Sequence, residues 1–109
     1  ELHLFFNPPV NISSVTLNGL VDVGSFIMPP AEIQIWSGDN IGAVKLVTKS
    51  SPEQPTAVVP SHMESYSIPI QSGKIRVIKL IVRQVARLPE WHPGKGQKAW
   101  VFFDEIFLN

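Results

Sequence analysis

Residues 88–109 read LPEWHPGKGQKAWVFFDEIFLN, a stretch in which a loop rich in proline and glycine leads directly into a hydrophobic segment. Pro89 and Pro93 restrict the backbone on either side of Trp91 and His92, and the glycines that follow permit a tight reversal. Beyond the loop come large apolar side chains that fit a buried pleated surface: Trp100, Val101, Phe102, Phe103, Ile106, Phe107 and Leu108. The stretch therefore predicts a recognition loop on a β-scaffold.

The rest of the chain also has a β-pattern. Val15, Leu17 and Val21 alternate with polar neighbours, as a half-buried strand requires, and no segment keeps apolar residues at helical spacing. Candidate strands span residues 2–6, 43–48, 65–70, 74–86 and 99–108, with two more around Val15 and Ile33. Residues 50–62 contain three prolines and are predicted to form a surface loop.

The strand expected at residues 74–86 changes phase along its length. Apolar side chains move from odd positions (Ile75, Val77) to even positions (Ile78, Leu80, Val82). Such a change predicts a β-bulge or twist between Val77 and Ile78. We expect the even-numbered set to pack in the core beside one of the phenylalanines at positions 102 and 103.

Length and composition indicate one domain over residues 1–109. The chain is 44% hydrophobic and has 109 residues, which suits a single sandwich of roughly 100 residues. It has no cysteine, so it can form neither a disulfide framework nor a thiolate metal site. No apolar run approaches the ~20 residues that a membrane helix needs. We expect a monomer with no membrane insertion.

The charges balance overall but are unevenly distributed. Nine basic and nine acidic residues cancel, so no net field attracts nucleic acid or an anionic membrane. Most of the cations fall in one stretch: Lys74, Arg76, Lys79, Arg83, Arg87, Lys95 and Lys98. On the predicted strand, Lys79, Arg83 and Arg87 share a face. This row is either a solvated face that protects an exposed strand or an anion-binding surface, and both interpretations stay open.

The sequence contains no recognisable catalytic set. Asp104 and Glu105 are adjacent on a strand and cannot flank one glycosidic bond, so each is either a structural carboxylate or an oxygen ligand of a structural calcium ion. His3, His62 and His92 lack metal-ligand spacing, and no zinc-protease or serine-hydrolase motif occurs. Residues 94–99 formally match a dinucleotide fingerprint, but they precede a strand instead of opening a helix.

Two tryptophans are candidates for ligand contact. Trp36 is in phase with Glu32 and Gln34 on the polar side of its strand, just before a Ser-Gly-Asp turn. An exposed indole could stack on a sugar ring, whereas a buried one would pack beneath a loop. The same two interpretations apply to Trp91.

Three stretches carry a family resemblance: residues 11–30, NISSVTLNGLVDVGSFIMPP; residues 31–40, AEIQIWSGDN; and residues 88–109. Together they resemble the galactose-binding-like, or discoidin-type, jelly rolls related to the type C domains of coagulation factors V and VIII. The resemblance is strongest to the C-terminal module of bacterial chitobiase-like (β-hexosaminidase) proteins. It implies an all-β jelly-roll sandwich of about eight antiparallel strands. Family domains are longer, so residues 1–109 are expected to lack the N-terminal part of the module.

The resemblance also implies a function and a location. It implies a noncatalytic accessory module of an exported glycoside hydrolase, in the bacterial periplasm, on the cell surface or outside the cell. Its partners would be a glycan and the catalytic domain of the parent protein. For a hexose or N-acetylhexosamine, the candidate contacts are Trp91, His92, Lys95 and Trp36. The alternative is a structural module that packs against its hydrolase, and an independent enzyme has the least support.

Overall fold

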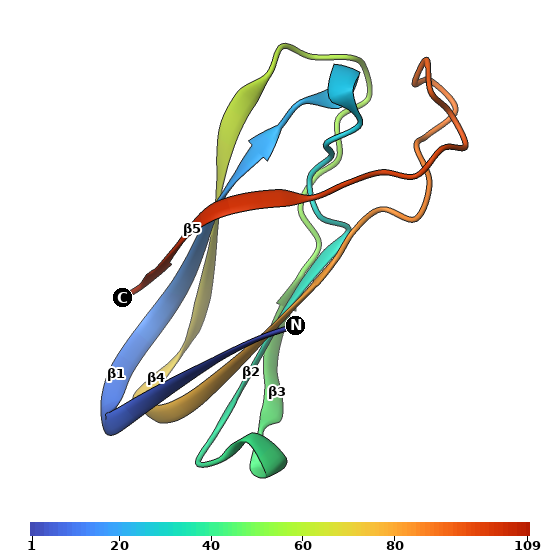
Figure 1. The fold of residues 1–109 in the computed structure, drawn as a ribbon. Helices are drawn as coiled ribbons and strands as arrows, with labels where there is room; N and C mark the ends of the chain where they lie inside the picture. The colour runs from blue at the N-terminus through green and yellow to red at the C-terminus, as the bar shows by residue number, and fades with distance from the viewer.

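The computed structural model describes residues 1–109, apart from the side chain of Ser72. Its strands form a single antiparallel sheet in the order β3-β2-β4-β1-β5 (Figure 1). They are β1 (Leu2–Val21), β2 (Glu32–Gly38), β3 (Lys45–Ser50), β4 (His62–Arg83) and β5 (Phe102–Leu108). Two short 3-10 turns are η1 (Val23–Ser25) and η2 (Ile41–Ala43). Within the described chain, no helix is long and apolar enough to cross a membrane.

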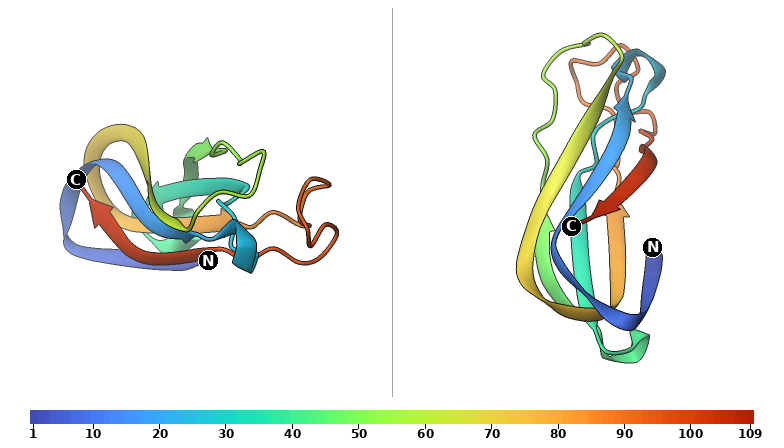
Figure 2. Two further views of the ribbon diagram at one scale, coloured as in Figure 1. Left: turned by 90° about the horizontal axis from the view of Figure 1, so that it is seen from above. Right: turned by 90° about the vertical axis from the view of Figure 1, so that its left-hand side faces the viewer.

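The sheet curls on itself because β1 and β4 are long and bent (Figures 1 and 2). The start of β1 pairs with the second half of β4, and the rest of β1 pairs with the first half. The register breaks between Phe5 and Val10, where Pro8 and Pro9 lie, because proline cannot donate a ladder hydrogen bond. One layer therefore contains β3, β2 and the second half of β4, and the other contains the first half of β4, most of β1, and β5.

The predicted all-β sandwich is confirmed, but the strand count is wrong. The sequence pattern predicts seven segments and the resemblance implies about eight, whereas the sheet has five continuous strands. The segment at residues 2–6 continues through the two prolines into β1, and the segments at residues 65–70 and 74–86 join as β4. Both junctions look like loops in the sequence, yet the backbone stays extended through them.

The main core lies between the two layers. Its buried members are Ile12, Val15, Leu17, Ile33, Ile35, Ile68, Ile70, Ile75, Ile78 and Leu80. Phe103 and Val82 pack against this cluster, whereas Phe102 is 51% exposed, so Phe103 is the phenylalanine that faces the core. Val77 and Ile78 are both buried, which confirms that the buried face changes phase there. The pairing with β1 and β2 runs through both residues without a register shift, so no β-bulge lies between them.

A second, smaller core holds the loops at one end of the sandwich. Val21, Val23, Met28, Leu88 and Ala99 are its buried members. Phe26, Val59, Val85 and Trp91 pack against them from the loops and the chain that follows β4. The loops around residues 22–31, 51–61 and 84–101 are therefore fastened to one another, and this end contains both the predicted recognition loop and a pocket.

Candidate functional site

His92 is packed inside the predicted recognition loop. Its side chain is 3% exposed, and its Nε2 lies 2.5 Å from the Val23 carbonyl oxygen. The Gly94 amide donates a hydrogen bond to Nδ1 at 2.8 Å. Because Nδ1 accepts, the ring proton must sit on Nε2, which donates to Val23. Both ring nitrogens are thus used within the protein.

Trp91 and Lys95 differ in their surroundings. Trp91 is partly buried against the second core, with its ring centroid 5.7 Å from that of His92. Phe26 meets His92 edge-on at 5.3 Å. Lys95 is exposed, and its Nζ lies 3.7 Å from the Glu90 carboxylate, an ion pair of the weak surface type. The three predicted residues lie on one loop, but Trp91 and His92 point toward the protein and only Lys95 points to solvent. Sugar binding by Trp91, His92 and Lys95 stays a prediction.

Trp36 lies away from that loop. It is near the end of β2 that leads to η2, whereas the loop is at the opposite end of the molecule (Figure 1). Its Nε1 donates to Gln34 Oε1 at 3.0 Å, and Gln34 Nε2 donates to Glu32 at 2.5 Å. Lys79 Nζ sits 4.3 Å above the indole centroid, a cation–π geometry. Trp36 is therefore half-buried and takes part in a row of side-chain contacts on the outer face of the sheet.

The three cations of the predicted basic row (Lys79, Arg83 and Arg87) all have neighbours within the protein. Lys79 covers an indole, and Arg83 is paired in register with Glu32 of β2. Arg87 lies past the strand, where its Nη1 donates to the Gly96 carbonyl at 3.3 Å. These contacts fit a solvated face. Anion binding by the row is untested.

The candidate calcium ligands lie on β5. Asp104 and Glu105 are both exposed. Glu105 pairs with Asn18 and Phe103 pairs with Gly19, so Asp104 is the extra residue of a β-bulge. Among the residues that the structure describes, no three histidine or carboxylate side chains gather as a metal site. Calcium binding by these two carboxylates stays a prediction.

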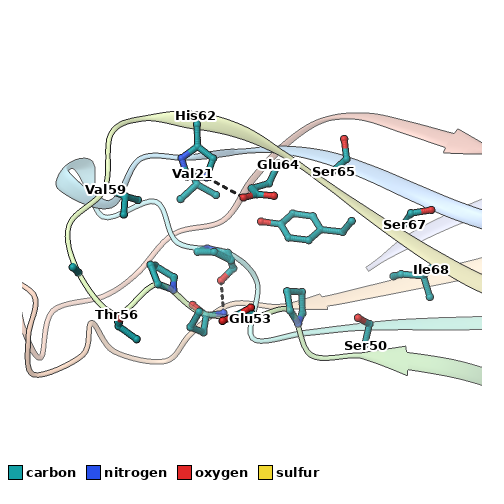
Figure 3. A pocket seen from close by; sticks show the side chains of 16 residues that line it. Val21, Ser50, Glu53, Thr56, Val59, His62, Glu64, Ser65, Ser67 and Ile68 are labelled. Atoms are coloured by element: carbon teal, nitrogen blue, oxygen red, sulfur yellow. Dashed lines mark hydrogen bonds and ion pairs between the residues drawn. The ribbon is translucent and has the colours of Figure 1, made fainter.

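A pocket of about 690 Å³ opens between the loop that follows β3 and the first half of β4 (Figure 3). Figure 3 shows His62 and Glu64 along the strand, with Glu53 and Thr56 across the hollow on the loop. Apolar lining comes from Val21, Pro29, Pro52, Pro55, Ala57, Val59 and Ile68, and hydrogen-bonding lining from Ser50, Glu53, Gln54, Thr56, His62, Glu64, Ser65, Tyr66 and Ser67. The pocket thus combines an apolar wall with several polar groups.

The side-chain amide of Gln54 anchors the loop in this wall. Its Nε2 donates to the carbonyl oxygens of Pro29 at 3.1 Å and Pro30 at 3.0 Å. Carbonyls only accept, so the amide nitrogen must face them and the position of Oε1 follows. That oxygen is buried and accepts no hydrogen bond from the described protein. An unpaired buried acceptor costs about 1–3 kcal/mol, and because this oxygen is shielded from solvent, a ligand in the pocket does not reach it in this structure.

Tyr66 supplies the aromatic side chain of the pocket. Burial raises the pKa of the phenol to about 12, and the nearby Glu64 carboxylate adds to the shift. The ring meets Phe103 edge-on, with centroids 6.1 Å apart. Tyr66 is therefore a protonated, positioned phenol at physiological pH.

His62 adds a titratable group at the rim. Its Nδ1 lies 2.9 Å from the Pro60 carbonyl and its Nε2 lies 3.0 Å from Glu64 Oε1. Both partners accept, so the imidazolium form satisfies both contacts at once. The Pro60 carbonyl, and after it Glu64, raises the pKa of His62 above its ordinary value.

The chain matches no protein-family model and no curated protein sequence. The class of ligand is therefore inferred from the side chains that line the pocket.

The pocket residues were missed because residues 50–62 look like a plain surface loop. A signal does exist in β4. His62, Glu64 and Tyr66 alternate in phase with the buried Ile68 and Ile70, so they continue the inner face of the strand beyond the core. Polar residues on a core-facing phase predict a site at the open end of a sandwich.

Proposed function

We propose that this β-sandwich is a noncatalytic carbohydrate-binding module of the galactose-binding-like kind. In this proposal it accompanies an exported bacterial chitobiase-like glycoside hydrolase and binds hexose or N-acetylhexosamine units. The observation that carries the proposal is the pocket beside β4, where one aromatic ring lies among several hydrogen-bonding side chains. Sugars combine apolar C–H faces with hydroxyls, and such a wall complements both.

Three side chains have distinct roles in this proposal. The Tyr66 ring contacts the apolar face of a sugar, and the exposed Glu53 carboxylate accepts a hydrogen bond from a hydroxyl. Glu64 accepts from a second hydroxyl at the rim. The volume of about 690 Å³ is within the ~300–1,000 Å³ range of small-molecule sites.

Binding should be weak, because a sugar buries little apolar area and its hydroxyls must be desolvated. We expect a Kd on the order of 0.1–1 mM, or about −4 to −5.5 kcal/mol. A tethered catalytic domain would add avidity.

The test is a titration of galactose, N-acetylglucosamine and chitooligosaccharides, followed by amide chemical shifts in wild type, Tyr66→Ala and Trp91→Ala. Shifts around Gln54 and Tyr66 that disappear in Tyr66→Ala would support the pocket. Shifts centred on Trp91 would instead place the binding site at the loop around Trp91 and His92. An unchanged spectrum at ~50 mM sugar, far above the expected Kd, would refute carbohydrate binding.

A second candidate function, packing against a neighbouring domain, is favoured by an apolar outer face. Met63, Leu20 and Phe102 lie side by side in register across β4, β1 and β5. Met63 is 53% exposed, Phe102 51% and Trp100 52%, a concentration typical of interaction surfaces. If a parent domain covers this face, Phe102→Ser should lower the Tm of the full-length parent more than that of the isolated module. Equal shifts in both proteins would argue against this role.

A further inference from the structure

Carboxylates outnumber bases around the pocket. Glu53 and Glu64 are carboxylates on opposite sides of the hollow (Figure 3), and His62 is the titratable base. Among the described residues that line it, none is lysine or arginine. The site therefore carries two negative charges when His62 is neutral and never a net positive one. A ligand with a negative charge would meet repulsion from both walls.

Two of the hydrogen-bonding side chains of the pocket can only accept. The Gln54 amide nitrogen is occupied by two proline carbonyls and its oxygen is shielded from solvent, so this side chain offers a ligand no free donor. Ionised Glu53 and Glu64 can only accept. The hydroxyls of the lining can donate or accept, so the two carboxylates set the preference for a ligand that brings several donors at one point.

We infer that the pocket prefers a hexosamine whose amino group is free and protonated over its N-acetylated, neutral and carboxylated counterparts. This inference rests on the proposed carbohydrate function. An ammonium group carries three donors and a positive charge. An acetamide replaces them with one N–H and a carbonyl acceptor, and a neutral sugar lacks the charge.

The expected preference is modest because both carboxylates are exposed to solvent. Exposed ion pairs are weak and are screened by salt, so we expect about three- to tenfold tighter binding of the amino sugar at low ionic strength. Most of this preference should vanish near 1 M salt, where the screening length is about 3 Å. The binding of a neutral sugar should change little with salt.

The experiment compares glucosamine, N-acetylglucosamine, glucose and glucuronate by amide chemical-shift titration at low and high salt. Wild type is compared with the Glu53→Gln/Glu64→Gln double variant and with Glu90→Gln. Glu90 is an exposed carboxylate outside the pocket, and its replacement is the control for the loss of one negative charge elsewhere on the surface. The wild-type salt series tests the charge preference independently of whether the double variant folds.

Each outcome has a defined meaning. Tighter glucosamine binding that is lost in the double variant and kept in Glu90→Gln supports the inference. Equal binding of glucosamine, N-acetylglucosamine and glucose overturns it and leaves the carbohydrate function intact. An equal loss in Glu90→Gln overturns it as well, because the preference would then reflect overall charge. If none of the four sugars shifts a pocket resonance, both the inference and the proposed function fail.

Discussion

Tyr66 reports on the pocket because it is the one tyrosine of the chain. Burial raises its pKa to about 12, whereas an unfolded chain titrates near ~10. The folded state therefore favours the neutral phenol. As the pH rises through this window, the unfolded state ionises first and the free energy of unfolding falls. We expect the ultraviolet absorbance of the phenolate in the folded protein to give a midpoint close to 12. A midpoint near ~10 would mean that Tyr66 is solvated.

His92 shows how one residue can decide between a binding loop and a packed loop. Its Nε2 donates to the Val23 carbonyl, 69 positions earlier in the chain. We expect His92→Phe to keep an aromatic contact with Phe26 but to leave the buried Gly94 amide without its acceptor, while the Val23 carbonyl keeps only the Phe26 amide as a donor. The free energy of unfolding should then fall by about 1–3 kcal/mol in urea denaturation. Lys95→Ala, at an exposed position, is the control and should stay within about 0.5 kcal/mol of wild type. Equal effects of the two changes would contradict the packed arrangement.

The local pattern of two prolines, a tryptophan and a histidine could not distinguish these cases. Restricted backbone and aromatic side chains are common to loops that bind ligands and to loops that pack. The deciding contacts come from Val23 and Phe26, which belong to the second core and lie more than 60 residues earlier in the chain. The sequence therefore predicted a rigid loop but not the direction in which its imidazole points.

At the scale of elements, alternation predicted the strands well and their continuity poorly. Inward-facing Val15, Leu17, Ile33 and Ile35 are all buried, as the period-two pattern requires. The bend near Pro8 was not foreseeable, because proline is typical of both a turn and a strand edge. The choice depends on whether a distant partner strand is present. Here the second half of β4 supplies that partner.

The pairing of β1 with β5 depends on a glycine at the bulge. A Cβ at Gly19 would lie 2.6 Å from the Phe102 carbonyl oxygen and 2.9 Å from the Phe103 ring. Backbone cannot yield cheaply, so Gly19→Ala should destabilise the fold by about 1–3 kcal/mol and loosen β5 first. Hydrogen exchange of the β5 amides would measure this local effect. Gly73→Ala is the control, because a Cβ there would meet no atom within 4 Å. Unchanged β5 exchange in Gly19→Ala would refute the close approach.

At the scale of the whole molecule, two strands are shared by both layers. β1 and β4 each cross from one layer to the other, so the layers cannot separate without breaking the same two strands. Small domains usually unfold in one cooperative step, and this connectivity reinforces that tendency. A cavity made in one layer should therefore weaken both layers equally.

Leu80→Ala tests this coupling. Leu80 is buried in the main core, in the half of β4 that pairs with β2, while β5 belongs to the other layer. We expect a loss of about 2–5 kcal/mol in the free energy of unfolding. Tryptophan fluorescence and far-ultraviolet dichroism should give the same denaturation midpoint, and the slowest-exchanging β5 amides should lose protection together with those of β2.

Leu46→Ala is the control, because it removes an exposed side chain of the edge strand β3 and should lower the free energy of unfolding far less. A loss below about 0.5 kcal/mol for Leu80→Ala would mean that Leu80 is not in the core. Two separate midpoints would mean that the layers unfold independently.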